Sequence, residues 1–166
     1  MQLTIREPGS ALTHFIACLM ASIAASPLII KASTGTAAAA LAVFAVSMIL
    51  LYGASTLYHS VNVTGKVLNI FRKIDHMMIF VLIAGSYTPV CLIVLGGSMG
   101  YTLLALVWGV ALAGMCVNMC WITCPKWFSS AIYIAMGWIC LLVFGTLWNT
   151  LPHAAFGWLL AGGVIY

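Results

Sequence analysis

Charge is what this sequence lacks most. Only 5% of its 166 residues are charged, and just two of them, Glu7 and Asp75, are acidic. An ordinary soluble domain is about a quarter charged, because water has to solvate its surface. The apolar share is 64%, which so few polar groups cannot cover. The composition therefore excludes a soluble globule and predicts an integral membrane protein whose surface is solvated by lipid.

Two further absences exclude other classes of protein. The six Lys and Arg residues are scattered between apolar runs, so the net charge of +4 does not indicate nucleic-acid binding. None of the six cysteines forms a CxxC pair, and nothing indicates a disulfide framework. Cys116, Cys120 and Cys124 recur every four residues and would line one side of a helix. Small, buried, lipid-compatible packing is the favoured interpretation of this row, and a metal or redox role is the alternative.

What the sequence has instead is a series of apolar runs. A spanning helix needs about 20 mostly apolar residues. We predict an all-α, multi-pass transmembrane bundle that forms a single domain over residues 1–166. The predicted spans are about 12–30, 37–58, 75–95, 101–120 and 128–148, with a shorter run at 153–166. Because this last run is short for a crossing, we expect the chain to be a fragment that stops within a sixth helix.

The first run has an alternative interpretation as a cleaved signal peptide, since "ASIAAS" resembles a cleavage site. Glu7 in the leader, and Thr13 and His14 early in the apolar run, favour an uncleaved first span. The basic residues then predict its orientation. If the N-terminus is cytoplasmic, Lys31 alone lies outside. The cations on the cytoplasmic side are then Arg6, Lys66, Arg72, Lys73 and Lys126.

On this topology, the polar residues that are costly in lipid gather near the cytoplasmic face. They are Glu7, His14, Ser55, His59, Asp75 and His76. Ser55 and His59 are four residues apart and share one helix face. Asp75 and His76 are adjacent at the predicted start of the third span, so only one of them can face the same interior point. A charged side chain at mid-membrane costs about 2.5–3.5 kcal/mol on insertion scales, so its retention needs a reason.

Two interpretations of this group stay open. Each side chain can reach the headgroups or cap a helix, as an Asp at a helix start does. Alternatively, Ser55, His59 and Asp75 converge on a metal ion with a bound water, because the charge of the ion offsets the burial of the carboxylate.

Several blocks of the sequence resemble, in order, those of the bacterial hemolysin III family. They are "REPGSALTHFIA", "YGASTLYHS", "RKIDHMMIFVLIAGSYTPV", "LVWGVALAG", "YIAMGW" and "LAGGVIY". That family is related to the progestin and adipoQ receptors and, more distantly, to the alkaline ceramidases. The resemblance implies seven transmembrane helices and a zinc ion near the cytoplasmic side. It also implies that His59 is a zinc ligand and that Ser55 and Asp75 act beside the zinc or through its bound water. Two more ligands would come from an H-x3-H pair in the last helix.

The sequence departs from the family pattern at two places. Residues 1–166 do not contain the H-x3-H pair, and His59 is their only match to a ligand position of the family. A catalytic zinc usually takes three protein ligands, so we expect these residues alone to bind zinc weakly or not at all. Gly9 and Ser10 in the first block also stand near a place where the family has an Asn.

The resemblance implies three candidate functions. The first is a zinc-dependent intramembrane hydrolase of a lipid amide or ester, with Asp75 as general base and Ser55 orienting the water. The second is a non-enzymatic membrane or lipid sensor or receptor with a structural zinc. The third is cytolysis, implied by the family name, although no amphipathic secreted segment supports a pore. The expected location is the bacterial plasma membrane, and the expected partner is membrane lipid.

Overall fold

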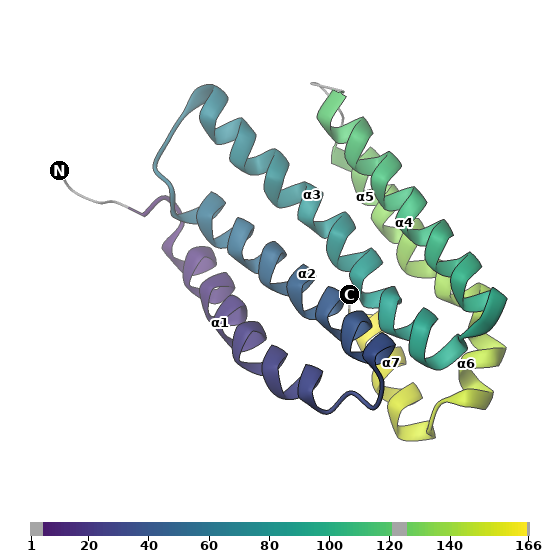
Figure 1. The fold of residues 1–166 in the computed structure, drawn as a ribbon. Coiled ribbons are helices and arrows are strands. Elements are labelled where there is room, and N and C mark those ends of the chain that lie inside the picture. Colours follow the sequence, from purple (N-terminus) through teal and green to yellow (C-terminus); the bar gives the residue numbers. More distant parts are fainter. Residues whose placement is uncertain (1–4, 121–125, 166) are drawn as a thin grey trace.

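The computed structural model describes residues 5–120 and 126–165, and within these ranges the regular structure is entirely helical. Four long helices form the first part of the bundle: α1 (Pro8–Ile30), α2 (Gly35–Ser60), α3 (Gly65–Pro89) and α4 (Gly97–Cys120). Each runs antiparallel to the one before it and packs beside it (Figure 1). A π-helical segment, η1 (Val90–Leu95), continues α3 after Pro89. The expected multi-pass helical bundle is confirmed.

The second part of the bundle contains a broken helix. Helix α5 (Lys126–Trp138) is followed by a 3₁₀ segment, η2 (Ile139–Val143), and by α6 (Phe144–Thr150). Together these elements form the fifth apolar stretch, Trp127–Thr150, that is long enough to cross a membrane. Helix α7 (His153–Ile165) is apolar but shorter. Helix α5 packs against both α3 and α4, and α7 contacts α6.

The start of α3 is the main difference from the predicted spans. The predicted spans left residues 59–74 between the second and third helices, yet only residues 61–64 separate α2 from α3. Gly65 has a φ of +65°, which glycine adopts readily and other residues do not, so the chain can turn sharply there and begin a new helix. Asp75 consequently lies inside α3 and not at its start. The interpretation of Asp75 as a residue that caps a helix start is therefore wrong.

Small residues let the central helices approach one another closely. Phe80 of α3 is fully buried, and its ring occupies the space that a Cβ atom on Gly114 of α4 would fill. On the other side of α3, a Cβ atom on Gly85 would overlap the side chain of Ser47 of α2. Close approach through small residues is how membrane helices gain packing energy, since lipid removes most of the hydrophobic drive between them.

The break between α5 and α6 has an identifiable cause. In a regular helix, the backbone N–H of Cys140 would donate to the carbonyl of Met136. Here it donates instead to the hydroxyl oxygen of Tyr87, at 2.9 Å. The single O–H of Tyr87 is shared in turn between the carbonyl oxygens of Met136 and Gly137, each at 2.9 Å. A tyrosine of α3 is thus inserted into the hydrogen-bond ladder of the neighbouring helix, which is a recognised cause of helix breaks.

The cysteine row has no metal-binding geometry in the described part of the chain. Cys116 and Cys120 lie in the last turns of α4 and are both exposed, so the expectation of buried packing is wrong for them. Cys124 lies outside the described residues.

Lys73 of α3 donates to the carbonyl of Met119 at 3.3 Å, which places a cation at the C-terminal end of α4, where the helix dipole favours it.

Candidate functional site at one end of the bundle

The polar segments meet at one end of the bundle, at the top of Figure 1. The start of α1, the end of α2 and the start of α3 lie there, together with the end of α4 and the start of α5 (Figure 1). The connection between α1 and α2, which carries Lys31, lies at the opposite end. Because successive helices run in opposite directions, these segments lie at the same end. They are the segments that carry the five cations predicted to lie on one side of the membrane. We call this end of the bundle the basic end.

His59, near the end of α2, is bound by Glu7, the residue just before α1. Its ring nitrogen Nδ1 lies 2.6 Å from the Oε2 atom of Glu7. The backbone N–H of Glu7 also donates to the carbonyl oxygen of His59, at 3.0 Å. An ionised carboxylate can only accept a hydrogen bond, so Nδ1 carries the proton in this pair. In the neutral imidazole, the second ring nitrogen, Nε2, then carries the lone pair.

Three other side chains surround this pair. Arg6 places Nε 3.2 Å from the Oε1 atom of Glu7, and its guanidinium carbon lies 4.2 Å from the centroid of the Tyr58 ring. The ring of His14, from α1, stacks on that of His59 with 5.4 Å between centroids and 16° between planes. The His59 side chain is 18% exposed and that of Glu7 is 47% exposed, so the imidazole is more enclosed than the carboxylate that holds it.

Ser55 and Asp75, the other predicted site residues, have different surroundings. Ser55 lies one helical turn before His59 on α2 and is buried, with 5% of its surface exposed. Asp75 lies on α3 with a side chain that is 14% exposed, and its Oδ2 atom is 4.0 Å from Nδ1 of His76. Across the described ranges, no hydrogen bond or ion pair joins Asp75 to Ser55 or His59. Their convergence stays a prediction.

The imidazole of His76 is bonded within its own helix, whereas that of His59 is bonded to a residue beside another helix. Its Nδ1–H donates to the carbonyl oxygen of Arg72, one turn earlier on the same helix, at 2.7 Å. This bond is local to α3 and connects no second element. The Glu7–His59 contact instead joins residues 52 positions apart and fixes α1 against α2.

Comparison with known proteins identifies the family. The family described as "Haemolysin-III related" matches residues 3–166. The chain is 40% identical to "Hemolysin-3" of Bacillus cereus over 168 aligned residues, which cover 99% of this chain and 76% of that protein. It is 39% identical to "Hemolysin-3 homolog" of Bacillus subtilis (strain 168), over 98% of this chain and 78% of that protein. No solved structure matches it.

The chain belongs to the haemolysin-III related family. The resemblance noted in the sequence is therefore confirmed at the level of the family. The chain is an integral, multi-pass membrane protein. Its five long apolar helices indicate this, and so does its family membership.

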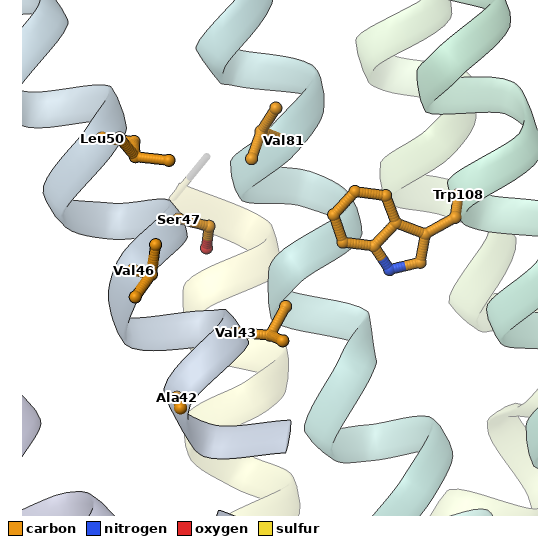
Figure 2. A pocket seen from close by; sticks show the side chains of 7 residues that line it. All are labelled: Ala42, Val43, Val46, Ser47, Leu50, Val81 and Trp108. Carbon is orange, nitrogen blue, oxygen red and sulfur yellow. The ribbon is translucent and has the colours of Figure 1, made fainter. Parts of the chain in front are cut away.

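Two crevices of this haemolysin-III related protein lie along the seam between α2 and α3. The first, of about 340 Å³, is lined by Ala42, Val43, Val46, Ser47, Leu50, Val81 and Trp108 (Figure 2). Ser47 is its one polar residue besides the Trp108 indole, and its hydroxyl donates to the carbonyl of Phe44 at 2.7 Å. The second, of about 420 Å³, shares Leu50 with the first and continues along both helices. Neither is lined by His59, Ser55 or Asp75, so the crevices offer apolar surface and no acid–base group.

Sequence reasoning placed Glu7 at the correct end of the bundle but did not identify its contact with His59. It also did not identify Arg6 and Tyr58 as neighbours of that pair. One signal was available: a lone Glu directly before a spanning helix, on the side where a His ends the next helix. Opposite helix directions bring such positions together, although they do not by themselves establish contact.

Proposed function

We propose that this membrane protein is a zinc-dependent hydrolase of a lipid amide or ester bond, with His59 as a zinc ligand. One observation carries the proposal: Glu7 binds the Nδ1–H of His59 at 2.6 Å and leaves Nε2 available. A histidine that ligates a metal usually donates its other N–H to a carboxylate, a backbone carbonyl or a water in this way. A protein with five membrane-spanning helices would meet a lipid substrate directly in the bilayer.

The described residues fit one ligand of such a site and not the whole of it. Within residues 5–120 and 126–165, no group of three or more His, Cys, Asp or Glu side chains is placed to hold a metal ion. A catalytic zinc usually takes three protein ligands. His14 does not supply a second, because two stacked parallel imidazoles do not direct their lone pairs at one point. The proposal therefore requires ligands beyond those that the structure brings to His59.

The remaining roles follow from the positions of the two other predicted residues. A zinc ion held by His59 and further ligands would supply a water whose pKa is lowered to about 7. Asp75, with a mostly buried carboxylate on α3, is the proposed proton acceptor. Ser55 is buried one turn from His59, where its hydroxyl is proposed to orient the reacting water. We further propose that the basic end is cytoplasmic and that the membrane is the bacterial plasma membrane, by the positive-inside rule.

The metal is tested first, by zinc titration of the purified chain in detergent. We expect weak binding that His59→Ala abolishes and that His153→Ala leaves unchanged, since His153 begins α7 away from the basic end. Equal zinc affinity in the parent and in His59→Ala contradicts the assignment. One tightly held zinc per chain would overturn the expectation that residues 1–166 lack a full set of ligands.

Catalysis is tested separately, with fluorescent lipid amides and esters as substrates. A general base contributes about 10²–10⁴-fold to the rate, so Asp75→Ala should reduce hydrolysis by that factor. The zinc affinity and the melting temperature should stay unchanged. A sensor or receptor with a structural zinc would show no turnover in the parent and a lower melting temperature in His59→Ala.

A second candidate function is lysis of membranes, favoured by the name of the relative from Bacillus cereus, "Hemolysin-3". Purified protein added to the outside of liposomes should then release an enclosed dye. Release by the parent and equally by Asp75→Ala would favour this function over hydrolysis.

A further inference from the structure

We propose that the seam between α2 and α3 binds an anionic phospholipid, with an acyl chain in the second crevice and the phosphate at two cations near the start of α3. These cations are Lys66 and Arg72. The proposal does not rest on zinc or on hydrolysis, because Ser55, His59 and Asp75 line neither crevice. The lipid at this seam is a bound partner and not the substrate of the proposed reaction.

The second crevice has the chemistry and the depth of a site for an acyl chain. Its lining is entirely apolar and consists of Ile49, Leu50, Gly53, Ala54, Leu57, Phe71, Ile74 and Met78. Along α2 it extends from Ile49 to Leu57, which is a rise of about 12 Å. Half of the hydrocarbon core of a bilayer is about 15 Å deep. An acyl chain from the leaflet at the basic end can therefore lie along the whole crevice.

The borders of this crevice are open to the bilayer. Leu50, Leu57 and Ile74 are large apolar side chains, and all three are exposed. Gly53 and Ala54, also in the lining, fill little of the space between the two helices. In a membrane, either acyl chains or another protein helix cover such a surface.

The charges near the start of α3 favour a lipid as the occupant. Lys66 and Arg72 are both exposed, and within residues 5–120 and 126–165 neither side chain forms an ion pair or a hydrogen bond. The chain has two carboxylates, and each has another partner: Glu7 pairs with Arg6, and Asp75 lies beside the histidine that follows it. A phosphate supplies the negative charge that the protein lacks here, as at other basic pockets between membrane helices.

The positions of the cations match the order of groups in a phospholipid. Helix α3 begins at the basic end, and its first residue in the crevice is Phe71 (Figure 1). Lys66 lies about 7.5 Å closer to the start of the helix, on the side of the headgroups. Arg72 follows Phe71, and a long arginine side chain at that depth can extend to the headgroup layer. Charge followed by an apolar crevice corresponds to phosphate followed by acyl chain.

The headgroup is tested by native mass spectrometry of the purified chain in detergent, with phosphatidylglycerol and phosphatidylcholine that carry the same acyl chains. The parent should bind phosphatidylglycerol more tightly. Lys66→Gln and Arg72→Gln should each weaken that binding about fivefold and leave phosphatidylcholine unchanged, since one cation near a membrane surface has about that effect. Lys31→Gln, at the opposite end of the bundle, is the matched control and should bind as the parent does.

Two results overturn the headgroup site. One is equal affinity of the parent for the two lipids, and the other is unchanged binding of phosphatidylglycerol in both variants. Glycerol phosphate, which has no acyl chain, should not compete with the lipid at the same concentration. Competition at equal concentration would show a site for free phosphate and would overturn the lipid assignment.

The acyl chain is tested with Ala54→Phe, which places a ring in the second crevice and should lower the affinity for both lipids by the same factor. Ala113→Phe adds the same bulk at an exposed position of α4 and is the control. If Ala54→Phe does not fold, Leu57→Ser at the exposed border takes its place. Unchanged affinities in the folded variant overturn the crevice as the site. A lipid-free dimer of the parent that Ala54→Phe dissociates would show that a second copy covers the seam, which also overturns the proposal.

Discussion

The basic end and the centre of the bundle enclose polar groups in opposite ways. At the centre, the Tyr87 hydroxyl shares its O–H between two carbonyl oxygens and accepts from one backbone N–H, so its hydrogen-bonding capacity is used within the protein. At the basic end, His59 uses Nδ1, and no hydrogen bond from its Nε2 occurs within the described ranges. The hydrogen bonds of Tyr87 hold neighbouring helices together. The Nε2 atom of His59, in contrast, can bind a ligand from outside the described residues.

The centre of the bundle is also more deeply buried than the basic end. Phe80, Tyr87 and Cys91 belong to a continuous buried cluster formed by α3, η1, α4, the broken fifth helix and α7. Helix α1 contributes few buried residues, only Ala11 and Ala21. The centre should therefore determine the stability of the fold, and the basic end should determine function. Substitutions in the two regions test this division.

The largest expected effect is that of Phe80→Ala. The ring is fully buried, packs edge-on against Tyr133 with 4.5 Å between centroids, and fills the space beside Gly114. Removing it leaves a cavity among α3, α4 and α5, which should lower the free energy of unfolding by about 3 kcal/mol. Thermal unfolding in detergent measures the loss. Phe15→Ala on α1, with a side chain 52% exposed, is the matched control and should change little.

The next largest effect is expected for Tyr87→Phe. The ring remains, but the N–H of Cys140 and the carbonyl oxygen of Met136 lose the hydroxyl as a partner, and the carbonyl oxygen of Gly137 keeps only the Cys140 thiol, at 3.3 Å. A buried donor left unsatisfied costs about 1–3 kcal/mol, and thermal unfolding should show a loss in that range. Tyr101→Phe, at a position 62% exposed, serves as the control. An unchanged melting temperature in Tyr87→Phe would contradict the expected contribution of the hydroxyl to stability.

The sequence predicted the helices better than their contacts, and the reason is physical. Apolar length marks a spanning helix, so five long apolar helices could be predicted from the composition of the runs alone. In a soluble protein, the apolar stripe of a helix also shows which face is buried. In lipid, both faces are apolar, so the sequence does not show that Phe80 faces Gly114 or that Tyr87 enters the next helix.

The candidate site was predictable to the same limited degree. Alternating helix directions placed Glu7, His59 and Asp75 at one end of the bundle. The distribution of the cations among the connections indicates which ends lie on the same side of the membrane. The rotation of each helix about its axis was not predictable. For that reason the contact of Glu7 with His59 was not predicted, and the convergence of Ser55, His59 and Asp75 on a metal stays a prediction. The start of α3 was missed because "VTGKVLNIFRK" looks like a loop in composition.

The smallest expected effect on stability is that of Glu7→Ala. The Glu7 side chain is 47% exposed and its ion pair with Arg6 lies at the end of the bundle. Exposed ion pairs contribute about 0–1 kcal/mol, and the backbone bond from Glu7 to His59 is retained in the variant. The melting temperature should therefore fall less than in Tyr87→Phe. A fall as large as that of Phe80→Ala would mean that the contact anchors α1, and the division between a stabilising centre and a functional end would then be wrong.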